Sequence, residues 1–199
     1  MSGMLRGLPS QLPPGERLLW QGSPDWRLFA RSAFRWRWLA LYFGALALTG
    51  VAGGSFEGAL ITLVTGALCL GLVALFAWAT ARNAVYTLTD RRIVMHIGIA
   101  LPMSFNFPLA RIAAADLRPI GQGHGDIALT LEGGRIAYFL LWPHARSWRF
   151  RAPQPCLRAV PDAQDVAAML FRARARLSPV ASAEAMAQSP APQPIGVAA

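Results

Sequence analysis

The sequence contains no lysine, few charged residues and only two cysteines, and each shortage excludes a class of protein. Charged residues make up 15% of the 199 residues, whereas soluble domains carry about 25%, so the chain is not an ordinary soluble domain. Hydrophobic residues reach 54%, which excludes disorder throughout the chain. Cys69 and Cys156 lie in segments of different character and cannot supply a disulfide framework, which indicates a reducing compartment. All 19 basic residues are arginine and the net charge is +9, a composition that a GC-rich coding bias also favours, so we expect no nucleic-acid partner.

Two long runs lack any charged residue. The first lies between Arg37 and Glu57, and the second between Glu57 and Arg82. A helix needs about 20 apolar residues to cross a bilayer, so both runs are predicted to be transmembrane helices that form a hairpin over residues 36–81. The alternative is a pair of buried core helices, but core helices rarely run this long without a charge.

Arginine flanks this predicted hairpin on both outer sides, while its tip carries no positive charge. By the positive-inside rule both termini lie in the cytoplasm. The flanking arginines are Arg27, Arg31, Arg35 and Arg37 before the first run, then Arg82, Arg91 and Arg92 after the second. Aromatic residues that suit the membrane–water interface accompany them: Trp36, Trp38, Tyr42, Trp78 and Tyr86.

Small residues spaced four apart allow helices in lipid to approach closely. The candidate helix-packing residues are Ala40, Gly44, Gly50, Gly54, Ala67 and Gly71. They serve either the packing of the hairpin itself or contact with a partner helix. Neither run contains Asp, Glu, Lys, Arg or His, which argues against a proton relay or an ion path.

The second half of the chain changes to short alternating runs broken by turn residues, which predict antiparallel strands. We expect strands at 85–89, 92–97, 103–107, 111–120, 126–131 and 135–142. After an irregular passage, 143–161, a helix begins at Asp162 and carries apolar residues at helical spacing to Leu177. The fold class is therefore a membrane α-hairpin plus an α+β domain, in which a C-terminal helix caps an antiparallel sheet or partly open barrel.

Four parts follow from this pattern: a cytoplasmic lead-in (1–35), the hairpin (36–81), a cytoplasmic domain (82–177) and a disordered tail (178–199). Arginine interleaved with tryptophan predicts a lipid or partner surface, the alternative being a solvated loop; its residues are Arg146, Trp148, Arg149 and Arg151. The histidines, His96, His124 and His144, lack metal-ligand spacing. We expect no catalytic residue, no metal and no bound cofactor.

Three short phrases resemble the bacterial pleckstrin-homology-like membrane family. They are Tyr86-Thr-Leu-Thr-Asp-Arg-Arg-Ile-Val94, Pro108-Leu-Ala-Arg-Ile112 and Gly123-His-Gly-Asp-Ile127. Three longer phrases are similar to a branch of that family that assists assembly of the photosynthetic reaction centre. They are Leu12-Pro-Pro-Gly-Glu-Arg-Leu-Leu-Trp-Gln-Gly-Ser-Pro-Asp-Trp26, Ile97-Gly-Ile-Ala-Leu-Pro-Met103 and Leu141-Trp-Pro-His-Ala-Arg146.

The resemblance implies a non-catalytic assembly factor in the inner (intracytoplasmic) membrane of purple phototrophic bacteria. It implies a PH-like domain, a homodimer, and partners among the reaction centre or antenna subunits. Two other functions stay open on the residues themselves. One is a module that binds anionic membrane lipid through the Arg146–Arg151 surface, and the other is a membrane enzyme.

Overall fold

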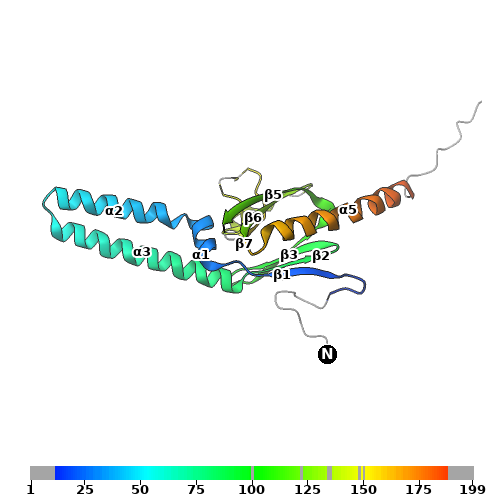
Figure 1. The fold of residues 1–199 in the computed structure, drawn as a ribbon, viewed down its shortest axis with the longest axis horizontal. Coiled ribbons are helices and arrows are strands. Elements are labelled where there is room, and N and C mark those ends of the chain that lie inside the picture. The colour runs from blue at the N-terminus through cyan, green and yellow to red at the C-terminus, as the bar shows by residue number, and fades with distance from the viewer. Residues whose placement is uncertain are drawn as a thin grey trace, which may run out of the picture.

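The computed structural model describes residues 12–99, 101–121, 123–133, 136–147, 149 and 151–187, with side chains up to Leu177. A rod of two helices projects from a body of strands (Figure 1). The elements are β1 (Leu18–Gly22), α1 (Trp26–Phe29), the π-helix η1 (Ala30–Phe34), α2 (Trp36–Ala52), α3 (Phe56–Asn83), β2 (Val85–Thr89), β3 (Arg92–Ile97), β4 (Met103–Pro108), the 3₁₀-helix η2 (Leu109–Arg111), β5 (Ile112–Gly121), β6 (His124–Leu131), α4 (Tyr138–Leu141), β7 (Cys156–Val160) and α5 (Ala163–Ala187).

The strands form two antiparallel sheets where the sequence predicted one. The first has the order β1-β2-β3-β4 and the second the order β5-β6-β7. A shared core of apolar side chains includes Tyr86, Met95 and Leu129 from the strands with Val166 and Leu170 from α5. Helix α5 therefore closes the sheets, as its apolar periodicity predicted.

The helical rod is inserted between two neighbouring strands of one sheet. β1 precedes the rod and β2 follows it, yet they pair antiparallel, with Leu18 opposite Thr89 and Gly22 opposite Tyr86. The sequence division into a lead-in (1–35) and a domain (82–177) therefore cuts through this sheet. Both ends of the rod are held at the same place on the body.

Two predicted segments differ from the structure. Within the described part of 135–142 there is the short helix α4 rather than a strand. The helical turn lets Leu141 reach the core, and Trp142 stacks on Phe76 of α3 with 5.7 Å between the ring centroids. The passage 143–161, expected to be irregular, contains β7, all of whose side chains are buried.

The tail predicted to be disordered, 178–199, also differs from the structure in its first part. α5 continues to Ala187, ten residues beyond the predicted end, because the segment is rich in alanine, the strongest helix former. Residues 188–199 lie outside the described part of the chain.

The rod consists of α2 and α3, which run antiparallel side by side. Among the described residues, α3 is the one helix long and apolar enough to cross a membrane by length and composition, and only 11% of its most apolar 18-residue stretch is buried. α2 has 17 residues, so its crossing remains a prediction. Large apolar side chains are exposed along both helices, such as Leu48 (71%) and Leu68 (65%).

Candidate functional site at the base of the helical hairpin

We call the region where the rod meets the body the junction; it comprises α1, η1, the first turn of α2 and the last turns of α3. Asp25 is the N-cap of α1, and its carboxylate accepts hydrogen bonds from the backbone N–H groups of Arg27 (2.9 Å) and Leu28 (3.0 Å). This is an ordinary N-cap, which stabilises a helix by about 1 kcal/mol. The cap sets the direction in which the chain leaves β1 for the rod.

The junction is attached to the second sheet as well as to the first. The Asp25 backbone N–H donates to the carbonyl of Ala159 in β7 (3.1 Å). Phe29 is fully buried, and its ring lies 5.1 Å from the ring of His144. Ala30 of η1 and Ala77 of α3 complete a small buried cluster with Phe29 and Ala159. The orientation of the rod is therefore coupled to both sheets.

Beneath the junction lies a buried network of polar side chains. The Tyr86 hydroxyl is 2.6 Å from His144 Nδ1 and accepts a hydrogen bond from the Arg158 backbone N–H (3.3 Å). The direction of the bond between the hydroxyl and His144 follows the imidazole tautomer: the Tyr86 O–H donates when Nδ1 carries no hydrogen, and Nδ1–H donates when it does. Nε2 has no hydrogen-bond partner among the described residues.

Arg158 is the buried charge at the centre of this network. Its guanidinium donates to the Ala145 carbonyl (2.6 Å) and to Ser147 Oγ (3.0 Å), and it lies 3.5 Å from an Asp126 carboxylate oxygen. The other Asp126 oxygen accepts from the Ala159 N–H (2.9 Å). A buried charge needs such partners, since leaving it unpaired costs several kcal/mol.

The titratable groups of this network are poorly suited to proton transfer near neutral pH. Burial, with the charge of Arg158, lowers the pKa of His144 to about 3. Burial raises the pKa of Tyr86 and raises the pKa of the Cys156 thiol to about 12. Within the described part of the chain, no group of three His, Cys, Asp or Glu side chains could hold a metal ion. The network joins β2, β6 and β7 through Tyr86, Asp126 and Arg158 beneath the junction.

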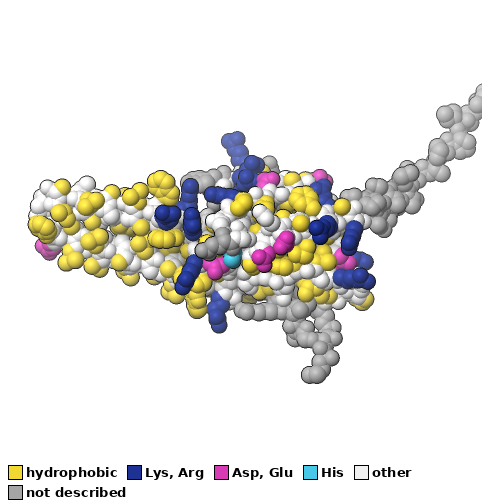
Figure 2. All heavy atoms as spheres, viewed as in Figure 1, with side chains coloured by type: hydrophobic (Ala, Val, Ile, Leu, Met, Phe, Trp, Pro, Cys, Tyr) yellow, Lys and Arg dark blue, Asp and Glu magenta, His cyan; other side chains and the backbone are white. Residues whose placement is uncertain are grey.

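Outside the network, exposed arginine and tryptophan surround the junction, and we call this set the collar. Figure 2 shows the arginines gathered where the apolar rod meets the body. Arg27 Cζ lies 5.3 Å from the ring centroid of Trp26, and Arg82 Cζ lies 5.6 Å from that of Trp78, both within cation–π distance. The exposed members of the collar are Trp26, Arg27, Arg31, Arg35, Trp36, Arg37, Trp38, Trp78 and Arg82.

The rod carries two grooves of similar size and different lining. The first, about 510 Å³, lies within the collar and is lined by Trp26, Arg27, Ala30, Trp36, Leu70, Gly71, Val73 and Ala74. The second, about 500 Å³, is purely apolar and is lined by Ala40, Leu41, Gly44, Ala45, Ala47, Leu48, Val51 and Leu63. We call them the collar groove and the α2 groove.

The predicted helix-packing residues divide between the rod's own contact and these grooves. A Cβ added at Gly50 would lie 3.3–3.4 Å from Ala59, whereas one at Gly44, Gly54 or Gly71 would meet nothing within 4 Å. Ala40 and Gly44 line the α2 groove and Gly71 the collar groove, while Ala67 is exposed. Gly50 alone of the four glycines therefore serves close packing within the rod.

Sequence reasoning missed a second close contact in the rod. Gly66 is buried against Phe43, and a Cβ added there would lie 2.8 Å from both Cβ and Cγ of Phe43. Gly66 lies seven residues after Ala59, which is also buried on α3. A spacing of seven places two residues on one face of a helix pair, and this spacing could have predicted the contact.

The predicted surface of Arg146, Trp148, Arg149 and Arg151 is not assembled as one cluster. Arg146 pairs with Asp116 (2.6 Å) and with the Gln154 side chain (3.1 Å), because it joins the loop to β5. Arg149 and Arg151 are exposed, and Trp148 lies outside the described residues. Two of the three predicted arginines, Arg149 and Arg151, are thus exposed without being drawn into the Arg146 contacts.

Comparison with known families gives the class of protein to which this fold belongs. The chain belongs to the bacterial PH domain family, whose model matches residues 32–174, a span that contains α2, α3 and strands β2 to β7. This confirms the family that the sequence phrases indicated.

A particular relative comes from Rhodobacter capsulatus and is described as "Uncharacterized 23.7 kDa protein in puhA 5'region". It is 41% identical over 179 residues, which cover 84% of this chain and 83% of the relative. No solved structure matches the chain.

Proposed function

We propose that the rod crosses a bacterial inner membrane twice and leaves the body and both termini in the cytoplasm. The pairing of β1 with β2 supports this topology. Since those strands precede and follow the rod, both ends of the rod must lie on one side of the membrane. If α3 crosses, α2 must return.

The lengths of the two helices agree with this proposal. At 1.5 Å per residue the 28 residues of α3 extend about 42 Å and the 17 of α2 about 26 Å. The second value is slightly less than the hydrocarbon thickness of about 30 Å, a mismatch that local thinning and snorkelling arginines accommodate at small cost. The collar then lies at the cytoplasmic headgroups.

Within that topology we propose a non-catalytic assembly factor for the photosynthetic reaction centre and its antenna in purple bacteria, a counterpart of the assembly protein PuhB. The observation that carries this proposal is the 41% identity to a relative whose description refers to the puhA 5' region. The structure suits an adaptor, because its junction couples the rod to both sheets and its grooves leave helix surface unoccupied.

In this proposal the α2 groove receives a transmembrane helix of a nascent reaction centre or antenna subunit. Gly44 and Ala40 remove side-chain bulk there, which favours close packing of helices in lipid. A second copy of the chain completes a homodimer through the cytoplasmic body.

The test is deletion of the gene in a phototrophic host followed by complementation. Deletion should lower the amount of assembled reaction centre without changing pigment synthesis, and the unaltered gene should restore it. Gly44→Leu fills the α2 groove and should fail to restore it. Ala67→Leu places the same side chain at an exposed site outside both grooves and should succeed. Unchanged complex levels after deletion would refute the assembly function. Restoration of the complex by Gly44→Leu would refute the role of the α2 groove and leave the assembly function untouched.

Oligomeric state is tested separately by cross-linking the full chain in its native membrane. A cross-linked species of twice the monomer mass, at wild-type expression, is expected. Its absence would refute the homodimer and leave the assembly function untouched.

The collar groove favours a second candidate function, the binding of anionic membrane lipid. Its walls are apolar and aromatic, Arg27 stands at its edge, and the collar would lie at headgroup depth, where guanidinium pairs with phosphate. Native mass spectrometry should show that the chain retains phosphatidylglycerol over phosphatidylcholine. Gly71→Leu should abolish the preference and Gly44→Leu should leave it unchanged. Equal retention of both lipids by the unaltered chain would dismiss this function.

A further inference from the structure

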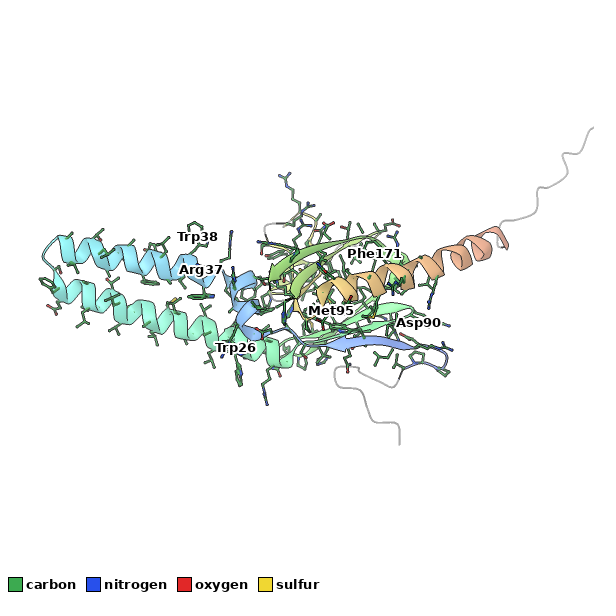
Figure 3. The ribbon with its side chains drawn as sticks, in the orientation of Figure 1. Trp26, Arg37, Trp38, Asp90, Met95 and Phe171 are labelled. Atoms are coloured by element: carbon green, nitrogen blue, oxygen red, sulfur yellow. The ribbon has the colours of Figure 1, made fainter. Side chains whose placement is uncertain are left out.

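A basic cleft lies at the end of the body away from the rod. It has a volume of about 900 Å³ and separates α5 from β1 and the β2–β3 turn. Figure 3 labels Asp90, in that turn, at the opposite end of the body from Trp26 and Arg37 in the collar. The charged and large apolar residues that line the cleft are Arg17, Leu19, Asp90, Arg91, Met169, Arg172, Arg176 and Leu177.

Both walls of this cleft carry arginine. Arg17 and Arg91 stand on the strand side, while Arg172 and Arg176, one helical turn apart, stand on the α5 side. All four are exposed. Among the described residues none of their guanidinium groups forms an ion pair within 4.0 Å. Like charges that face each other across a cleft focus a positive potential and raise the local concentration of anions.

The single carboxylate in the lining does not neutralise this charge. One Asp90 oxygen accepts a hydrogen bond from the backbone N–H of Arg17 (3.0 Å), which fixes the turn. No described side chain in the lining therefore neutralises the charge of the four arginines.

The cleft is apolar between its arginines. Leu19 is 36% exposed, and Met169 and Leu177 are half-buried against the core. A small anion would occupy little of this volume and would leave these side chains in water. An amphipathic helix or strand would cover them while its acidic residues meet the arginines.

We infer that this cleft binds an acidic amphipathic segment of a partner protein. Headgroups of the membrane that holds the rod are excluded as occupants, because the cleft lies at the far end of the body. The inference goes beyond the assembly function and does not depend on it; only the exclusion of headgroups rests on the proposed membrane topology.

The experiment uses the full chain in nanodiscs of neutral lipid. The probe is a fluorescent peptide with glutamate along one helical face and leucine along the other, and a second peptide carries lysine instead of glutamate. The acidic peptide should bind and the basic one should not. The double variant Arg91→Glu/Arg172→Glu should weaken binding about tenfold or more, which corresponds to about 1.4 kcal/mol.

A matched double variant, Arg149→Glu/Arg151→Glu, makes the same change of net charge on the exposed loop and should leave affinity within about twofold. Leu19→Ser should weaken binding at high salt, where the apolar contact dominates. Equal loss in both double variants would show attraction by net charge only and would overturn the inference. If tripolyphosphate competes completely and Leu19→Ser has no effect, the cleft is a site for a small anion and not for a peptide. Absence of binding of the acidic peptide would also overturn the inference.

Discussion

Replacing Gly66 by alanine tests whether α2 and α3 pack as the structure has them. The added Cβ would lie 2.8 Å from Cβ and Cγ of Phe43 and 3.2 Å from its Cδ1. Carbon atoms in contact prefer about 3.5–4.0 Å, so the helices must separate by about 0.7 Å or distort. The Phe43 Cβ is attached directly to the backbone, so a change of side-chain rotamer cannot relieve the clash.

Overpacking of this kind costs about 1–3 kcal/mol. Alanine also gains up to about 1 kcal/mol over glycine in helix propensity, so the variant needs a control that shares this gain. Gly71→Ala supplies it, because nothing lies within 4 Å of its added Cβ. The free energy of unfolding should therefore be about 1–3 kcal/mol lower for Gly66→Ala than for Gly71→Ala.

The assay is thermal unfolding of both variants in the same detergent micelles. For a chain of this size, 1 kcal/mol shifts the midpoint by about 2–4 °C, so we expect Gly66→Ala to unfold about 2–12 °C below Gly71→Ala. Gly50→Ala, whose Cβ would lie 3.3–3.4 Å from Ala59, should fall between them. Equal midpoints for Gly66→Ala and Gly71→Ala would refute the packing of the rod.

Three further predictions concern the body. Because the pKa of folded His144 is about 3 against an ordinary 6.5, the unfolded chain binds the extra proton between these values. The free energy of unfolding should therefore show no loss from His144 above pH 6.5, and it should fall by at most about 1.4 kcal/mol per pH unit below that value. Denaturant titrations from pH 8 to 5 measure this dependence. His144→Phe should make the free energy of unfolding less dependent on pH. Tyr86→Phe removes the partner of His144 Nδ1 and should cost about 1–3 kcal/mol in urea unfolding; an unchanged midpoint would contradict the proposed network. Glu16→Gln weakens two hydrogen bonds of 2.8 Å to Arg92 and should cost about 1–3 kcal/mol, whereas Glu132→Gln, at an exposed turn, should cost less than about 0.5 kcal/mol.

Elements that are encoded by neighbouring residues were predicted well. The hairpin expected over 36–81 corresponds to α2 and α3, which begin at Trp36 and end at Asn83, because run length and charge decide a helix of this kind locally. The β2–β3 pair was also predicted, since a tight turn at Asp90 joins its strands.

Elements that depend on distant partners were missed. β1 is five residues long in a proline-rich segment, and its partner β2 lies more than 60 residues away. β7 contains Arg158, a residue that argues against a buried strand until its charge is compensated by Asp126. Eight of the nine collar residues were predicted at the membrane flank, and Trp26 was missed. Of the other residues predicted there, Tyr86 is buried in the core and Arg91 lines the cleft at the far end of the body. The two grooves were not predicted, because a groove is formed by surfaces that meet only in three dimensions.

By itself the amino-acid sequence determined the helical rod, its arginine collar and the alternating strands of the body, because each depends on the period or charge of contiguous residues. Only the tertiary structure decided that the rod is inserted between paired strands, that Gly66 rather than Gly44 brings its helices together, and that four arginines, from the residue before β1, a turn and α5, line one cleft. These features depend on which distant segments share a surface, and that choice is made by the packing free energy of the whole chain rather than by any local pattern.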